Sequence, residues 1–527
     1  MVRPQLIMGR PKVLFRMSSV AASVRFPWRL FSATFVVLFG LMTVWALATP
    51  LYAVPDEASH SIRAAAAVRG EIVGNNSRFQ VPAYLTIPGA QNTGVLSCYA
   101  GRMDRTPACT SDPGDDDQTR TLWSTADTNS PVYYLAVGFP TLVTDGLPAI
   151  YGMRILSAAL TALTFAVTAV LLWAFPRRRW ALLLGLAVLN PEVLFLSGSV
   201  NPNGMEIASA GALLASLLVL VRLRPTGWLL GVAGATAVVS TLFVTGGRSL
   251  ALLWVVLAAA AVIAVMSGTD WRAVIRRRST WIVAVLLAVI CLGELYWFTR
   301  PENSIRAQSA PVPGSRLKVA QDMLEATVAY WHQMAGQGAV DYGMPEFVPS
   351  LWTSLIFALC LLPVVLGRGR QRWVTLGLVG AMVVIPVLTQ VALWRQVGMV
   401  WQGRYVLAVL LMLAITGGLA LDEARLGAPR RTVRVLRALL VLLSVSQFVA
   451  LAAVVRRYAV VDTNWLHALF RPSWLPPGGS IGLLLILAAI LLLGTIALWR
   501  ALPRLFADPQ VASPVSAPAE AGALESR

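Results

Sequence analysis

Residues 31–50 read FSATFVVLFGLMTVWALATP, an apolar stretch that contains no charged side chain. A helix of about 20 apolar residues crosses the hydrocarbon core of a bilayer, which is about 30 Å thick. Apolar stretches of similar length recur at residues 150–175, 180–198, 205–221, 228–245, 249–267, 280–298, 350–366, 373–394, 404–421, 438–455 and 479–499. Backbone groups in lipid must bond within their own segment, so runs rich in Leu, Ala and Val predict helices rather than barrel strands. The expected fold class is an all-α, polytopic membrane protein with about twelve transmembrane helices.

The composition also points away from a soluble protein. Of the 527 residues, 57% are hydrophobic and 13% are charged, whereas about one quarter of the residues of a soluble domain are charged. The net charge of +18 would suit nucleic acid only if the basic residues gathered on a folded, soluble surface. Here they lie between the apolar runs, so the lipid bilayer is an expected partner and nucleic acid is not.

Basic residues mark one side of the membrane. In polytopic proteins Lys and Arg gather in the cytoplasmic connections, and here they flank every second connection. The groups are Arg3, Arg10, Lys12, Arg16, Arg25 and Arg29; residues 177–179; Arg222 and Arg224; Arg272 and residues 276–278; Arg368, Arg370 and Arg372; and Arg430, Arg431, Arg434 and Arg437. Both termini are therefore expected in the cytoplasm.

This pattern divides the chain into three parts. We expect a basic cytoplasmic N-terminus over residues 1–30 and a transmembrane domain over residues 31–500. The remaining residues, 501–527, are rich in Ala, Pro and Ser, and a segment of that composition buries too little apolar surface to fold. They form an expected disordered, cytoplasmic tail.

Two extracytoplasmic connections are long, namely residues 51–149 and 300–348. Loops of that length are commonly functional. Cys98 and Cys109 lie in the first of them, where a disulfide between the two would suit an oxidising compartment. We therefore treat this pair as a candidate disulfide and expect the chemistry of the protein on the external side.

The first external loop opens with the sequence VPDEASHSIR, over residues 54–63. Proline favours the first turn of a helix, so we expect a helix at the membrane surface on which Asp56 and Glu57 share a face with His60. Two interpretations are open. Either the carboxylates cap the helix and favour its positive dipole, or one of them is a general base whose pKa is raised by partial desolvation at the lipid boundary.

A second polar group falls in and after the third run. Glu192 lies within the run, and an acid inside a membrane is a candidate for function. The alternative is a structural ion pair with an arginine such as Arg154 or Arg248. Asn201 and Asn203 follow the same run, where they either cap the next helix or contact a substrate.

A third group, WQGRY over residues 401–405, stands at the external start of the tenth run. The free N–H groups of a helix N-terminus and the forked guanidinium of Arg404 suit a phosphate, and Gly403 would let a ligand approach the backbone. The alternative is interfacial anchoring by the aromatic rings, with Arg404 extended to the headgroups. In the second loop, Tyr342 lies among aromatic and polar residues that suit either a sugar ring or interfacial packing.

In this order the motifs resemble a bacterial membrane-protein family known as domain of unknown function 2142. The resemblance covers residues 30–460 and rests on Pro55-Asp56-Glu57 with His60, NSPVYY over residues 129–134, SGSVNP over residues 197–202, Tyr342-Gly343, and QGRY over residues 402–405. The family is similar to the GT-C class of polytopic glycosyltransferases, which use polyprenyl-phosphate sugars on the external face of the membrane. The resemblance implies a GT-C-like fold in the bacterial inner (plasma) membrane.

The resemblance also implies an inverting transfer of a sugar from a polyprenyl-phosphate donor to a glycan or lipid acceptor of the cell envelope. Asp56 or Glu57, of which we favour Asp56, would take the proton of the acceptor hydroxyl, and Arg404 and Arg63 would stabilise the departing phosphate. The expected substrate-binding residues are His60, Arg63, Asn129, Tyr133, Glu192, Asn201, Asn203, Tyr342, Gln402, Arg404 and Tyr405. No nucleotide is required. Asp56, Glu57 and His60 are candidate ligands of a divalent cation such as Mg²⁺ or Mn²⁺.

Two other functions fit part of the pattern. A secondary transporter, or a flippase of envelope precursors, would also have about twelve spans. It would carry acids deep in several spans and have modest loops, whereas the acids here concentrate in the first external loop. A non-catalytic protein of envelope assembly would use its loops to bind partners. Replacing Asp56 and Glu57 by their amides separates both functions from that of an enzyme.

Overall fold

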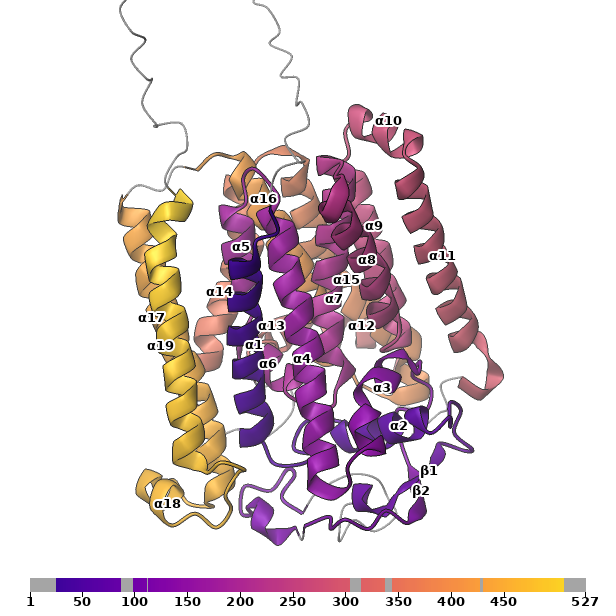
Figure 1. The fold of residues 1–527 in the computed structure, drawn as a ribbon, viewed down its shortest axis with the longest axis vertical. Helices are drawn as coiled ribbons and strands as arrows, with labels where there is room; N and C mark the ends of the chain where they lie inside the picture. The colour runs from indigo at the N-terminus through magenta and orange to yellow at the C-terminus, as the bar shows by residue number, and fades with distance from the viewer. Residues whose placement is uncertain are drawn as a thin grey trace, which may run out of the picture.

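The computed structural model describes residues 25–86, 98–110, 112–303, 314–336, 344–426 and 430–506, and it confirms the all-α class. Among these residues, ten single helices are long and apolar enough to cross a membrane (Figure 1). They are α1 (Trp28–Ala48), α4 (Gly146–Trp173), α7 (Pro202–Leu218), α8 (Gly227–Thr245), α11 (Arg278–Thr299), α14 (Phe347–Leu366), α15 (Gly369–Val397), α16 (Leu407–Glu423), α17 (Arg430–Ala459) and α19 (Ser480–Phe506). Most of the expected basic N-terminus and of the expected disordered tail lies outside the described residues.

Two further apolar stretches are each formed by two helices that meet at a sharp bend. α5 (Arg179–Leu186) and α6 (Pro191–Ser197) meet at 73°, and α9 (Leu252–Val265) and α10 (Gly268–Arg276) meet at 119°. The single helix predicted over residues 180–198 is therefore wrong. Asn190 accepts a hydrogen bond from the Val193 amide and starts a new helix, with Pro191 in its first turn. Counted as one span each, the two pairs bring the total in the described part of the chain to twelve, as predicted.

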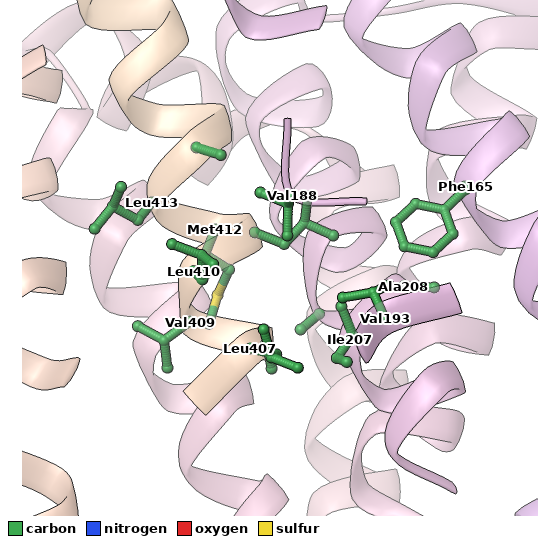
Figure 2. Close-up of a cluster of buried hydrophobic side chains, with 14 of the residues drawn as sticks. Phe165, Val188, Val193, Ile207, Ala208, Leu407, Val409, Leu410, Met412 and Leu413 are labelled. Carbon is green, nitrogen blue, oxygen red and sulfur yellow. The ribbon is translucent and has the colours of Figure 1, made fainter. Parts of the chain in front are cut away.

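α7 and α16 form the centre of the bundle, because 94% of the residues in the apolar stretch of each are buried. Figure 2 shows side chains of both helices, such as Ile207 and Leu410, beside Val188 and Val193 from the broken α5–α6 span. Small residues let the helix backbones approach closely. At Gly418 of α16, α5 lies so near that a Cβ atom would collide with its backbone. α11 and α19 lie at opposite edges (Figure 1) and bury only 6% and 11% of their apolar stretches, so their side chains face lipid.

The first long connection folds over one end of the bundle, which we call the loop face (Figure 1). It contains α2 (Glu57–Val68), α3 (Val132–Val137) and a two-stranded antiparallel sheet of β1 (Arg78–Pro82) and β2 (Thr119–Trp123). A second apolar core packs Phe79 and Tyr134 against Ile150 in the first turns of α4. α18 (Trp465–Phe470) lies at the same end. The loop face is therefore a packed layer that rests on the outer turns of the spans.

The second long connection contributes two short helices, α12 (Arg316–Glu325) and α13 (Thr327–Gln333). α12 packs against α15, and α13 packs against α14 and against the 3-10 turn Gly403–Val406 that leads into α16. This packing brings the second connection to the WQGRY motif.

The basic connections meet at the end of the bundle opposite the loop face. Three ion pairs join them there, namely Arg179 with Asp422 at 4.0 Å, Arg222 with Glu423 at 3.4 Å, and Arg224 with Asp270 at 3.4 Å. The connections that the sequence assigns to the cytoplasmic side thus share one end of the molecule, and the first long connection occupies the other.

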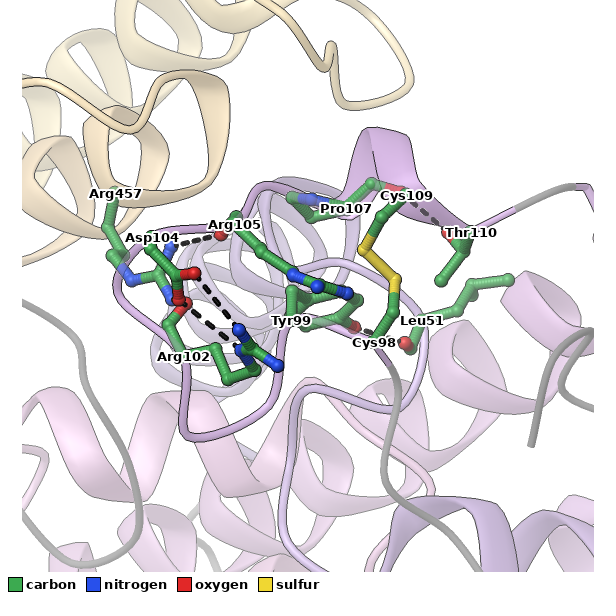
Figure 3. Close-up of a disulfide and its surroundings, with 10 residues drawn as sticks. All are labelled: Leu51, Cys98, Tyr99, Arg102, Asp104, Arg105, Pro107, Cys109, Thr110 and Arg457. Atoms are coloured by element: carbon green, nitrogen blue, oxygen red, sulfur yellow. Dashed lines mark hydrogen bonds and ion pairs between the residues drawn. A yellow bond between two sulfur atoms is a disulfide. The ribbon is translucent and has the colours of Figure 1, made fainter. Parts of the chain in front are cut away.

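Cys98 and Cys109 form a disulfide in the first connection, with their Cα atoms 6.2 Å apart (Figure 3). The loop that it closes is held at two further points. The Tyr99 hydroxyl donates to the Leu51 carbonyl at 2.6 Å, and the buried Arg457 of α17 donates to the carbonyls of Arg102 and Arg105. The disulfide loop is thereby fixed against α17 and against the end of α1.

Candidate functional site

Glu57 and Arg154 form a fully buried ion pair beneath the loop face. Both side chains have 0% exposure. Arg154 of α4 donates from Nε to Oε1 at 2.7 Å and from Nη2 to Oε2 at 2.6 Å. The amides of Tyr52 and Val200 donate to the same carboxylate, at 3.0 and 3.1 Å. The carboxylate of Glu57 therefore accepts four hydrogen bonds in the interior. The prediction that Glu57 shares a helix face with Asp56 and His60 is wrong.

The remaining donors of Arg154 hold the end of α1. Nη1 donates to the carbonyls of Ala46 and Thr49, and Nη2 to that of Pro50, each at 2.7 Å. One guanidinium thus satisfies the last carbonyls of a helix, which lack partners within it, and pairs with Glu57 a few residues later. Arg154 of α4 therefore fixes the turn between α1 and α2 from the inside of the protein.

Asp56 projects from this fixed turn. Its φ of 63° lies in the left-handed region, which Asp tolerates better than most residues but which still stores strain. The preceding residue is held by Asn201, whose Nδ2 donates to the Pro55 carbonyl at 3.0 Å. Asn201 also caps α7 by accepting from the Asn203 amide. The side chain of Asp56 makes no capping bond to α2, so the capping interpretation of Asp56 is wrong.

The carboxylate of Asp56 faces Arg404 instead. Nη2 of Arg404 donates to Oδ2 of Asp56 at 2.8 Å, across 348 residues of sequence. The Asp56 side chain is 45% exposed, whereas that of Arg404 is 1% exposed. Nε and Nη1 of Arg404 are buried and have no hydrogen-bond partner among the described residues. Arg404 thus carries donors that the described residues do not satisfy, next to a carboxylate that solvent can reach.

The pKa of Asp56 is lowered, contrary to the expectation that desolvation would raise it. Partial burial does raise the pKa, but the positive charges nearby, chiefly the guanidinium of Arg404 and more weakly that of Arg248, outweigh it. Asp56 is therefore ionised at neutral pH.

His60 lies one helical turn after Asp56 and is buried. Burial, assisted by the charges of Arg248 and Arg404, lowers the pKa of His60 to about 3, so the ring is neutral at physiological pH. Nδ1 is 2.8 Å from the hydroxyl of Tyr134, which also accepts from Nδ2 of Asn129 at 2.8 Å. Nε2 is buried without a partner in the described part of the chain. His60 and Asn129, both predicted site residues, thus meet on the hydroxyl of Tyr134.

Arg248 also belongs to the site, although the sequence suggested it only as an ion-pair partner of Glu192. It lies between α8 and α9, close enough to Asp56 to lower its pKa. The ring of Tyr405 lies 4.8 Å from the Arg248 guanidinium and 5.4 Å from that of Arg404. Its position offered a clue, because Arg248 lies at the external end of two neighbouring apolar runs, in a connection of only a few residues. The guanidinium groups of Arg404 and Arg248 and the ring of Tyr405 therefore lie close together near Asp56.

The profile of a family described as predicted membrane protein, domain of unknown function 2142 (DUF2142), matches residues 39–413. The chain belongs to this family. A comparison with curated proteins finds no match. Among solved structures, the chain is similar to the crystal structure of ArnT from Cupriavidus metallidurans bound to undecaprenyl phosphate, with 14% identity and a TM-score of 0.43 over 91% of this chain and 78% of that chain. A likeness at this level assigns no activity.

In this DUF2142 protein, the space beside the Gly403 backbone is filled by α13 of the same chain. A Cβ at this position would collide with the carbonyl of Tyr330 in α13, and the Gly403 amide donates to Oε1 of Gln333 at 2.9 Å. The expectation that Gly403 admits a ligand to the backbone is therefore wrong. The neighbouring Gln402 keeps its side-chain carbonyl oxygen buried without a partner among the described residues.

Other predicted residues of the DUF2142 chain support the loop face from below. Arg63 is buried and donates to the carbonyls of Glu71, Ile72 and Asn129, which ties the end of the first motif to the loop. The Tyr133 hydroxyl is 2.9 Å from that of Ser157 in α4. Neither contact involves Asp56 or Arg404, so a place for Arg63 at the departing phosphate finds no geometric support.

Glu192 and Asn203 are buried on α6 and α7. Arg154 is excluded as the partner of Glu192, because its five N–H donors go to Glu57 and to the end of α1. Tyr342 lies outside the described residues. Within the described residues no group of three His, Cys, Asp or Glu side chains could hold a metal ion. The candidate cation site of Asp56, Glu57 and His60 is not assembled, because Glu57 turns inward.

Proposed function

We propose that this protein is an inverting glycosyltransferase of the GT-C type, which moves a sugar from a polyprenyl-phosphate donor to a cell-envelope acceptor. The observation that carries the proposal is the pair of Asp56 and Arg404. A partly exposed, ionised carboxylate stands beside a buried guanidinium with two donor nitrogens, Nε and Nη1, that no described residue satisfies. A base for a hydroxyl and a binding group for a phosphate lie next to each other.

Arg404 and Arg248 are the phosphate-binding residues in this proposal. A guanidinium offers several donors in a planar fork that matches phosphate oxygens, and a buried one pays little entropy on binding. Burying a cationic donor without a hydrogen-bond partner costs free energy. A ligand that accepts hydrogen bonds from Nε and Nη1 removes this cost, which favours its binding. Arg248 adds a second positive charge, 4.8 Å from the centroid of the Tyr405 ring.

The transfer then follows from the neighbours of the phosphate. Asp56 takes the proton of the acceptor hydroxyl, whose oxygen attacks the anomeric carbon. The bond from that carbon to the phosphate oxygen breaks, and polyprenyl phosphate leaves with the electron pair, stabilised by Arg404 and Arg248. When the phosphate shares the Arg404 guanidinium, Asp56 loses part of the charge that lowers its pKa and becomes a stronger base. Glu57 holds the turn in place and takes no proton.

In this proposal the reaction takes place on the extracytoplasmic side of the bacterial inner membrane. The ion-paired basic connections at the opposite end suit the cytoplasm, and a disulfide in the loop face suits an oxidising compartment. Both termini are then cytoplasmic.

A deletion strain tests the function. In a bacterium that carries this chain, removal of the gene should cause a polyprenyl-phosphate sugar to accumulate and an envelope glycan or glycolipid to lose that sugar. Lipid extracts and envelope glycans analysed by mass spectrometry measure both. Unchanged levels of every polyprenyl-linked sugar, together with an unchanged envelope, would rule the proposal out.

Donor binding is tested with Arg404. In purified protein, Arg404→Ala should weaken the binding of undecaprenyl phosphate by roughly 10- to 100-fold, because a charge-assisted hydrogen bond contributes about 1.5–3 kcal/mol. Arg404→Lys, which keeps the charge without the fork, should fall between. The matched control is Arg471→Ala, an exposed arginine after α18, which should bind normally. Native mass spectrometry measures retention of the lipid, and equal retention by Arg404→Ala would contradict the assignment.

A further inference from the structure

A cleft of about 260 Å³ opens on the loop face beside the turn that carries Asp56. Its lining comes from several segments that are distant in sequence, which include Thr86, Tyr151 of α4 and three walls. Pro50–Tyr52 of the turn forms one wall, the disulfide loop with Tyr99 and Thr110 forms the second, and the connection between α18 and α19, at Trp474–Pro477, forms the third. The mechanism proposed above uses none of these residues except the turn.

The walls of the cleft are tied to one another. The Tyr99 hydroxyl bonds to the Leu51 carbonyl, and Arg457 holds the disulfide loop against α17 (Figure 3). The ring of Tyr458 lies between those of Tyr99 and Trp474, at centroid distances of 5.7 and 6.5 Å. The cleft is therefore formed by contacts within the protein before any ligand binds, as is usual for small-molecule sites.

The lining combines aromatic rings with oxygen atoms, and no Lys or Arg is among the described residues that form it. The rings are those of Tyr99, Tyr151 and Trp474, and the oxygens include the carboxylate of the exposed Asp112. Flat rings cover the C–H faces of a pyranose or furanose, while carboxylate and hydroxyl oxygens bond its hydroxyl groups. A phosphate would find no positive charge here.

We propose that this cleft seats a neutral sugar residue of the acceptor, so that the acceptor is a saccharide rather than a lipid headgroup. The inference rests on the proposed function and deepens it. Tyr52 lines the cleft, and its amide donates to Glu57, the residue that follows Asp56. The turn that holds the base thus also forms a wall of the cleft.

Saccharide binding to the purified full-length protein tests the cleft. The probes are the methyl glycosides of mannose, galactose, rhamnose and arabinofuranose, measured by saturation-transfer NMR, with sorbitol as a polyol that lacks a ring. At least one glycoside should bind, and Trp474→Ala and Asp112→Asn should each weaken it by roughly three- to tenfold. The controls are Trp465→Ala, an exposed Trp of α18, and Asp115→Asn, an exposed acid of the same loop.

The outcomes separate this inference from the proposed function. Binding that Asp112→Asn and Trp474→Ala leave unchanged, or no binding of any glycoside, would overturn the acceptor site. Asp56→Asn should bind the glycoside as the wild type does, and its effect falls on turnover alone. If Asp56→Asn retains full activity while Trp474→Ala and Asp112→Asn lose the sugar, the cleft is a saccharide site and the proposed mechanism fails.

Discussion

Replacing Asp56 by asparagine is expected to slow sugar transfer by roughly 10²- to 10⁴-fold, the range that a general base contributes. Asparagine still accepts a hydrogen bond from Arg404, so the loop and the donor site should keep their shape. It cannot take a proton. The rate constant should therefore fall while the affinity for undecaprenyl phosphate stays the same or rises, since one negative charge beside the phosphate is gone. The measurement is the turnover of lipid-linked sugar in membranes of the deletion strain that express each variant.

Asp117→Asn, an exposed acid of the same loop, is the matched control and should turn over normally. The pH profile adds a second readout. The base works when ionised, and because the pKa of Asp56 is lowered, activity should be lost only as the pH falls below the ordinary value for aspartate, about 3.9. Arg404→Ala removes the largest opposing charge and should move this acid limb to higher pH. An Asp56→Asn variant that transfers sugar as fast as the wild type would show that Asp56 is not the general base.

The positions of the spans could be predicted from the sequence because each depends on a local run of apolar residues. The break at Asn190-Pro191 also has a local cause, a cap followed by proline, and a stricter interpretation of that dipeptide would have found it. The pairing of Asp56 with His60 on one face followed from their spacing of four residues. In each case the information lies within a few residues of the feature it determines.

The partners of the two acids could not be predicted in this way. Glu57 meets Arg154, 97 residues away, and Asp56 meets Arg404, 348 residues away. Asp56 precedes α2 with a left-handed backbone, whereas Glu57 is the first residue of the helix. The two side chains therefore point in different directions, and the partner that each one meets depends on where α4 and α16 pack. For the same reason Gly403 suggested an open approach for a ligand, whereas α13 fills that space.

The burial of Glu57 leads to the second large effect, which is on stability. Arg154→Met leaves the Glu57 carboxylate in an apolar interior without its cation, and the loss of one partner of a buried pair costs about 3–5 kcal/mol. The variant also frees the last carbonyls of α1 that Arg154 satisfies. We expect the free energy of unfolding, measured by denaturant titration in mixed micelles, to fall by at least that amount, with the loop face opening first.

The double variant Arg154→Met/Glu57→Gln distinguishes a buried charge from lost packing. Removing the charge as well should restore part of the stability, because a neutral amide costs less to bury than an unpaired carboxylate. Arg102→Met is the control: this arginine pairs with Asp104 at the surface, where both side chains are more than half exposed, and its loss should leave the free energy of unfolding almost unchanged. A loss equally small for Arg154→Met would show that the pair does not hold the turn. Asp56 would then need another explanation for its fixed, left-handed backbone.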